Sequence, residues 1–135
     1  KTLFPYTTLF RSVTVIAIFM RQFKAGEALT IDGDGGQTRD FTHVYDVVRA
    51  NLAAMKSAKV GKGEVLNIGN GQRYSVNYIA DQISQNVLRR ESPRGKGESR
   101  DTLADISLTK ELLDWNPEIP FEQGLEDLLK IEGIR

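Results

Sequence analysis

A glycine-rich run between two short apolar segments constrains this chain more than any other feature. Residues 33–41 read GDGGQTRDF, with glycine at positions 33, 35 and 36. Glycine accepts positive φ angles and allows a close approach of a ligand to the backbone. The run leads into Arg39, and arginine suits two-pronged binding of phosphate oxygens. It therefore predicts either an anion-binding loop, or a β-turn and strand in which Arg39 pairs with Asp40 or another acid.

Charge and composition narrow the classes of partner. The chain has 135 residues, enough for one domain with a core, and its 18 Lys+Arg balance 18 Asp+Glu. Because the net charge is zero, the chain does not attract nucleic acid or an acidic membrane, and we expect neither as a partner. An anion must instead be bound by individual arginines at the binding site. The absence of cysteine excludes disulfides and thiolate metal sites and fits a cytoplasmic protein, while the single histidine, His43, excludes a multi-histidine metal site. No apolar run is long enough for a membrane span.

Residues 2–12, TLFPYTTLFRS, differ in character from the rest of the chain. They match, residue for residue, the translation of a widely used sequencing-library adapter in one frame. The alternative is a natural strand rich in threonine and phenylalanine. We expect residues 1–12 to be an adapter-derived artefact and residues 13–135 to be a fragment whose natural sequence begins at Val13.

Apolar periodicity predicts four helices. The first carries Ile16 and Phe23 and stops near Gly26; the second, from Val44 to Met55, ends before Gly61. A third, capped by Ser75, carries an apolar face of Val76, Ile79, Ala80, Ile83 and Val87. The last begins at Pro120 and turns inward Phe121, Leu125, Leu128 and Leu129.

The remaining segments predict short strands and loops. Residues 29–31, 64–68 and 103–105 are expected to be strands, the second of them buried, and residues 41–44 to be extended. Residues 91–100 are expected to form a loop, Ser107 to cap a short helix through Leu112, and Trp115 to lie in the core. The pattern predicts a helix-rich α/β fold with short strands.

Four segments, in order, resemble one protein family: LTIDGDGGQTRDFTHVYDVVRA, VLNIGNGQRYSV, ESRDTLADIS and LLDWNPEIPFEQGL. Together they span residues 13–135 nearly without a gap. The chain resembles the C-terminal, substrate-binding part of the extended short-chain dehydrogenase/reductase family of nucleotide-sugar epimerases and dehydratases. The resemblance implies a small α/β substrate-binding domain without its Rossmann half.

The resemblance implies roles for residues of the glycine-rich run and the strand before it. Arg39 occupies the place of the arginine that binds the diphosphate of the sugar nucleotide. Thr30, Ile31 and Asp32 occupy the positions that lie along the nucleobase and contact it largely through backbone groups. Asp32 stands where many relatives carry an aromatic residue.

A second element of the family binds phosphate and ribose. Glu98 matches the acid that holds the ribose hydroxyls, and Arg94, displaced by a one-residue insertion, matches the second phosphate-binding arginine. Arg100 either shares that task or is solvated. Thr102 stands where some members carry a tyrosine, and its small side chain leaves room for an N-acetyl group on the sugar.

The catalytic and cofactor signatures of the family are absent from this sequence. No tyrosine is followed four residues later by lysine, the pair that exchanges a proton with the sugar hydroxyl. No glycine-rich strand-to-helix turn is present to bind a dinucleotide. We therefore expect no catalytic, cofactor-binding or metal-binding residue here, with NAD bound by a missing N-terminal half.

The resemblance implies a parent enzyme that is an NAD(P)-dependent nucleotide-sugar epimerase or dehydratase, a UDP-sugar 4-epimerase above all, acting as a homodimer. Alternatives within the family are a 4,6-dehydratase and a decarboxylase. An alternative from another class is a stand-alone, non-catalytic module that binds an anion or nucleotide. The fragment alone is expected to be inactive.

Overall fold

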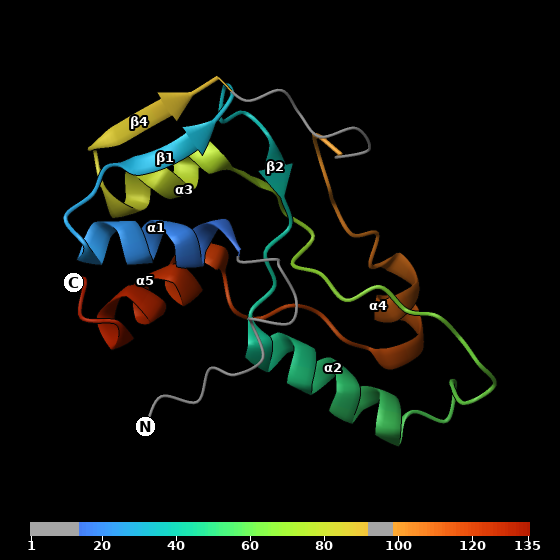
Figure 1. The fold of residues 1–135 in the computed structure, drawn as a ribbon. Helices are drawn as coiled ribbons and strands as arrows, with labels where there is room; N and C mark the ends of the chain where they lie inside the picture. Colours follow the sequence, from blue (N-terminus) through green and yellow to red (C-terminus); the bar gives the residue numbers. More distant parts are fainter. Residues whose placement is uncertain (1–13, 92–98) are drawn as a thin grey trace.

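The computed structural model describes residues 14–91 and 99–135 (Figure 1). The segment that matches an adapter, and the predicted site residues Arg94 and Glu98, lie outside these residues. Along the chain the elements are α1 (Val15–Lys24), β1 (Leu29–Asp32), β2 (Thr38–Arg39), α2 (Val44–Lys56), β3 (Tyr74–Ser75), α3 (Val76–Ile83), β4 (Val87–Arg90), α4 (Ser107–Leu113) and α5 (Phe121–Ile131).

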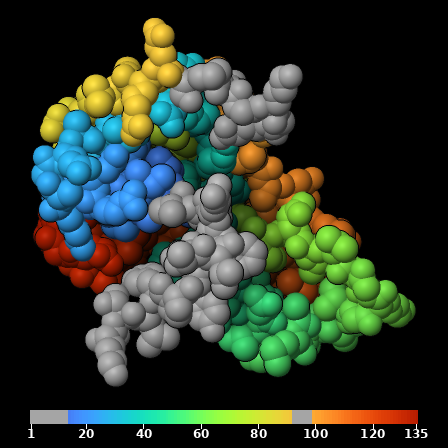
Figure 2. Space-filling model, in the orientation of Figure 1, coloured from blue at the N-terminus to red at the C-terminus, as the bar shows by residue number. Residues whose placement is uncertain are grey.

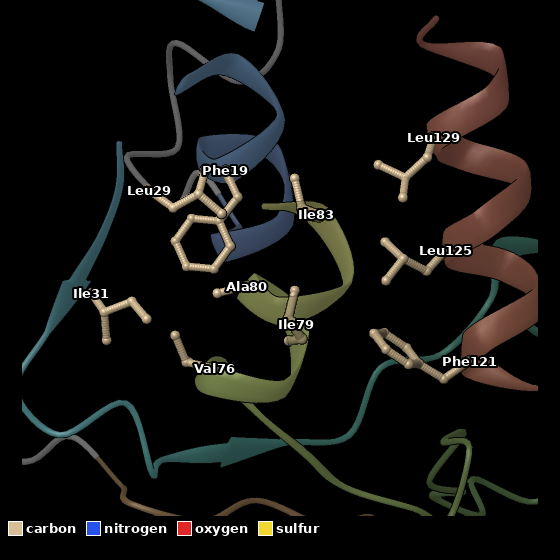
Figure 3. Packing of buried hydrophobic residues seen from close by; sticks show 10 residues of the cluster. All are labelled: Phe19, Leu29, Ile31, Val76, Ile79, Ala80, Ile83, Phe121, Leu125 and Leu129. Atoms are coloured by element: carbon tan, nitrogen blue, oxygen red, sulfur yellow. The ribbon is translucent and has the colours of Figure 1, made fainter. Parts of the chain in front are cut away.

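The larger half of the molecule is a layered unit under one small sheet. Strands β1 and β4 pair in parallel, from Leu29 opposite Val87 to Asp32 opposite Arg90. Helices α1 and α3 lie beneath this pair, and α5 lies below them (Figure 1). Figure 3 shows α3 in the centre, with side chains of α1 and β1 on one side and of α5 on the other. The buried cluster comprises Phe19, Leu29, Ile31, Val76, Ile79, Ala80, Ile83, Phe121, Leu125 and Leu129.

The smaller half is built around α2 and α4. Its buried cluster consists of Ala50, Ile106, Leu113 and Trp115. The fully buried carboxylate of Asp46 on α2 accepts hydrogen bonds from the backbone N–H groups of Glu118 and Ile119, each at 3.1 Å. This carboxylate therefore ties α2 to the segment that leads into α5.

Most of the predicted helices are confirmed. Helix α1 ends just before Gly26, α5 begins directly after Pro120, and Trp115 is 3% exposed. The Oγ atom of Ser75 accepts the N–H of Tyr78 at 3.1 Å, as expected of an N-cap residue. The helix-rich α/β fold with short strands is confirmed as well. Among the described residues, no helix has both the length and the apolar character that crossing a membrane requires.

Two predicted strands are wrong. Residues 64–68 are irregular, and the side chain of Val65 is 86% exposed, so this segment is neither a strand nor buried. Residues 103–105 are also irregular, and the nearest pairing is an isolated bridge between Thr38 and Asp101. An apolar or β-branched pattern becomes a strand only beside a partner, and no described strand lies alongside either segment to supply one.

Three predicted boundaries also need correction. Residues 41–43 are irregular, and helix α2 begins at Val44 with His43 as its N-cap. Helix α3 ends at Ile83 because Ser84 adopts extended backbone angles, which places Val87 in β4 instead. Ser107 is the first residue of α4 and does not cap it; Oδ1 of Asp105 accepts the N–H of Ser107 at 3.0 Å.

Candidate functional site

The glycine-rich loop docks by its carbonyl groups onto the start of α3. The carbonyl oxygens of Gln37 and Gly35 accept the N–H groups of Val76 and Asn77 at 3.1 and 3.0 Å. The carbonyl of Asp34 accepts Nδ2 of Asn77 at 2.9 Å. The first N–H groups of a helix have no partner within the helix, so these carbonyls satisfy them.

Gly35 is the glycine that this docking requires. Its φ is +68°, and a Cβ atom there would lie 2.2 Å from Oδ1 of Asn77 and 2.8 Å from Cγ2 of Ile31. Gly33 also has a positive φ, of +73°, but a Cβ at that position would meet open space. The sequence predicted a close approach to the backbone at these glycines. At Gly35, the group that approaches is Asn77 of α3.

Arg39 lies at the end of β2, beside the segment around residue 100. Its Nη1 atom donates to the carbonyl oxygens of Thr38 at 2.8 Å and of Arg100 at 2.9 Å. The N–H of Thr38 also donates to the carbonyl of Arg100, at 3.0 Å, and the N–H of Thr102 donates to the carbonyl of Thr38, at 3.2 Å. The structure thus brings together Arg39, Arg100 and Thr102.

The neighbouring carboxylate, Asp40, holds a separate part of the fold. It accepts the backbone N–H groups of Asn70 at 2.8 Å, Gly71 at 3.0 Å and Ala104 at 3.3 Å. Charge-assisted bonds to backbone donors are strong. Two consecutive residues of the run therefore contact different segments: Arg39 binds the carbonyl of residue 100, and Asp40 binds the turn at residues 69–71.

Arginine side chains from β4 and from residue 100 contact the glycine-rich loop and the end of β1. Nη1 of Arg89 donates to the carbonyl of Asp34 at 3.0 Å, and Nη2 of Arg100 lies 2.9 Å from Oδ2 of the same residue. Nε of Arg90 lies 4.0 Å from a carboxylate oxygen of Asp32. With Arg39, four guanidinium groups lie near the loop, together with the carboxylates of Asp32 and Asp34.

The sequence analysis did not single out Arg89 and Arg90, which the structure places beside the candidate site. They reach the loop because β4 pairs with β1 in parallel, so that Ile31 lies opposite Arg89 and Asp32 opposite Arg90. The pairing joins segments far apart in the sequence. No local pattern in residues 87–90 signals it.

The three residues expected along a nucleobase lie on β1 in different surroundings. The side chain of Ile31 is 1% exposed and belongs to the core, whereas that of Asp32 is exposed. The backbone N–H and hydroxyl of Thr30 are bound to the side-chain amide of Gln22, at 3.1 and 2.7 Å. Gln22, a buried residue of α1, was not predicted to reach this strand.

The carboxylate of Asp101 connects the segment around residue 100 to Thr38 of β2. Its Oδ1 atom accepts the hydroxyl of Thr38 at 2.6 Å. This hydrogen bond, helped by the positive charges of Arg73 and Arg100, lowers the pKa of the Asp101 carboxyl below its ordinary value of 3.8. The carboxylate therefore stays ionised in the neutral range and supports the isolated bridge between Thr38 and Asp101.

Comparison with known proteins supplies a family. Residues 5–69 match the model of the "NAD dependent epimerase/dehydratase family". A UDP-N-acetyl-alpha-D-glucosaminuronate decarboxylase of Bacillus cytotoxicus is 34% identical over 126 residues, which cover 86% of this chain and 39% of that protein.

Two solved structures show the same arrangement of the chain. A UDP-glucuronic acid 4-epimerase from Bacillus cereus, in complex with UDP-glucuronic acid and NAD, matches with a TM-score of 0.78 and 33% identity over 89% of this chain and 40% of its own. A UDP-glucose 4-epimerase with UDP-glucose from Thermotoga maritima matches with a TM-score of 0.73 and 38% identity over 84% of this chain and 37% of its own. The chain thus spans well under half the length of these relatives.

Proposed function

Because the chain belongs to the NAD dependent epimerase/dehydratase family, we propose that it is the part of a nucleotide-sugar epimerase that binds the nucleotide diphosphate. The observation that carries the proposal is that Arg39 lies beside residue 100, while the side chains of Arg89 and Arg100 both contact Asp34 of the glycine-rich loop. Each charge-assisted hydrogen bond contributes roughly 1.5–3 kcal/mol, and a diphosphate offers several acceptors. UDP-sugars are the proposed substrates, since both similar structures hold one.

The described residues do not fit NAD. A dinucleotide pyrophosphate binds at the N-terminus of a helix that follows a glycine-rich turn. Here the N–H groups at the start of α3 are occupied by the loop carbonyls of Gly35 and Gln37. We therefore assign to residues 13–135 the role of holding and orienting the sugar nucleotide, while the cofactor and the Tyr–Lys pair belong to another part of the whole protein.

Decarboxylation is a second candidate reaction, because the curated relative from B. cytotoxicus is a decarboxylase. A non-catalytic anion-binding module is the candidate from another class. The natural gene separates them: a Tyr-x-x-x-Lys pair and a glycine-rich turn encoded upstream of residue 13 support an enzyme, and their absence supports the module.

Titration with UDP tests the proposed binding role. In the 135-residue chain, UDP is expected to bind, whereas Arg39→Ala weakens binding by roughly 2–4 kcal/mol, about thirty- to a thousand-fold. Arg39→Lys recovers only part of the loss, because an ammonium group cannot reproduce the planar fork of guanidinium. Calorimetry measures these affinities, and thermal melting of each variant verifies that it is folded.

NAD provides the matched comparison. In the same calorimeter, the chain alone is expected to show no stoichiometric NAD binding. It is also expected to show no epimerase turnover. If Arg39→Ala leaves UDP affinity intact, or if the chain binds NAD tightly, the role assigned to the loop is wrong.

A further inference from the structure

The carboxylate of Asp34 already occupies two donors of the glycine-rich loop. Its Oδ1 atom accepts the N–H of Gly36 at 2.9 Å, and its Oδ2 atom lies 2.9 Å from Nη2 of Arg100. A backbone N–H beside a guanidinium group is a donor pair that also suits a phosphate oxygen. The carboxylate of Asp34 therefore occupies donor groups that an anionic ligand would also use.

The geometry around Gly36 makes this contact possible. A Cβ atom at that position would lie 3.0 Å from Nη2 of Arg100 and 3.4 Å from Oδ1 of Asp34. The missing side chain thus leaves room for the guanidinium group to lie over the loop. The side chains of Arg100 and Asp34 are 49% and 57% exposed, so both are accessible to a ligand from solvent.

The carboxylate of Asp34 is not what anchors the loop. The carbonyl oxygen of the same residue is held by Nδ2 of Asn77 at 2.9 Å and by Nη1 of Arg89 at 3.0 Å. The carbonyl of Gly35 is held by the N–H of Asn77. These backbone anchors remain when the side-chain charge is removed, so the carboxylate can act on a ligand without controlling the shape of the loop.

We propose that Asp34 is an internal competitor of the ligand's phosphate, which keeps Arg100 occupied until a diphosphate displaces it. This inference rests on the proposed function, because it concerns the affinity of the same anion site. Arg100 is accordingly a binding residue for the diphosphate, released from Asp34 on binding. Asp34 lowers the affinity both by repelling the ligand and by holding the arginine.

Asp34→Asn tests the proposal directly. The amide oxygen of asparagine still accepts the N–H of Gly36, but the negative charge is gone. UDP and inorganic pyrophosphate are each expected to bind the Asp34→Asn chain about fivefold more tightly than the natural chain, the effect of one charge about 4 Å away in water. The gain should shrink as ionic strength rises from about 0.05 to about 0.5 M, because exposed charges are screened.

Two further variants separate competition from a change in net charge. Asp127→Asn removes the same charge from α5, the helix that lies on the side of the molecule away from the β1–β4 sheet (Figure 1). This variant should leave UDP affinity unchanged. In an Arg100→Gln background, Asp34→Asn should give less than half of its gain, because the donor that it frees is absent.

The outcomes distinguish a failure of this inference from a failure of the proposed function. If the natural chain binds UDP but Asp34→Asn binds it equally or more weakly, Asp34 has a structural role in the site. The inference then fails, while the proposed function stands. The inference also fails if half or more of the gain persists with Arg100→Gln. If neither the natural chain nor Asp34→Asn binds UDP or pyrophosphate, the proposed function fails and the inference with it.

Discussion

Single side chains around Arg39 have effects that depend on pH. Because the pKa of Asp101 is lowered in the folded chain, chiefly by the hydroxyl of Thr38, its carboxylate stabilises the fold above its ordinary pKa of 3.8. This stabilisation is lost as pH falls through the lower, folded-state value. Thr38→Val is therefore expected to melt at a lower temperature than the natural chain at neutral pH, with the difference shrinking as the pH falls below the ordinary pKa of 3.8 and through the folded-state pKa.

Melting curves followed by circular dichroism over this range of pH measure the effect, and Thr38→Ser, which retains the hydroxyl, is the matched control. A constant difference at every pH would mean that Thr38 acts through packing alone. The sequence singled out Arg39 as a candidate because its signal is local, in a glycine-rich run that contains an arginine. It did not identify Asp34 or Gln22, because their partners at residues 100 and 30 are set by tertiary packing.

Helices and strands differ in how far local sequence decides them. Ser75 was predicted to cap α3 and does so through the N–H of Tyr78. Ser75→Ala is expected to lower the free energy of unfolding by about 1 kcal/mol, because it leaves that N–H without its acceptor. Ser107→Ala, at the first position of α4, is expected to cost at most a few tenths of this amount.

Urea unfolding of both variants measures the comparison, and an equal loss would show that Ser107 has the capping role that the sequence assigned to it. The helix predictions succeeded because a 3.6-residue apolar period and a capping residue lie within one segment. The strand predictions at 64–68 and 103–105 failed because a strand is completed by hydrogen bonds to a second segment, which no pattern within the first one reveals.

The molecule as a whole exposes an apolar helix face. On α2, Val44 is 64% exposed, Leu52 47% and Met55 81%, while the opposite face buries Asp46 and Ala50. Figure 2 shows α2, in green, beside the projecting segment around residues 60–68. The 135-residue chain is therefore expected to self-associate and to bind a hydrophobic dye, because exposed apolar patches drive association.

Sedimentation of Leu52→Lys tests this surface: the variant should become monomeric and keep its melting temperature, whereas Ala50→Lys, on the buried face of the same helix, should unfold the chain. A monomeric natural chain that binds no dye would show that the α2 face needs no cover.

Deletion of residues 1–12 concerns the same whole-chain scale. If these residues are an adapter-derived artefact, their removal should leave the melting temperature unchanged or raise it. A clear drop on deletion, seen by differential scanning calorimetry, would show instead that they complete the core.

The parallel pairing of β1 with β4 also sets an order of events during biosynthesis. It joins residue 29 to residue 87, and contacts between such distant residues form slowly. As the chain leaves the ribosome, the glycine-rich loop emerges long before α3 and β4, the elements that hold it. The nascent loop can thus acquire its folded shape only after residue 90 has emerged, so the candidate site is one of the last parts of the chain to form.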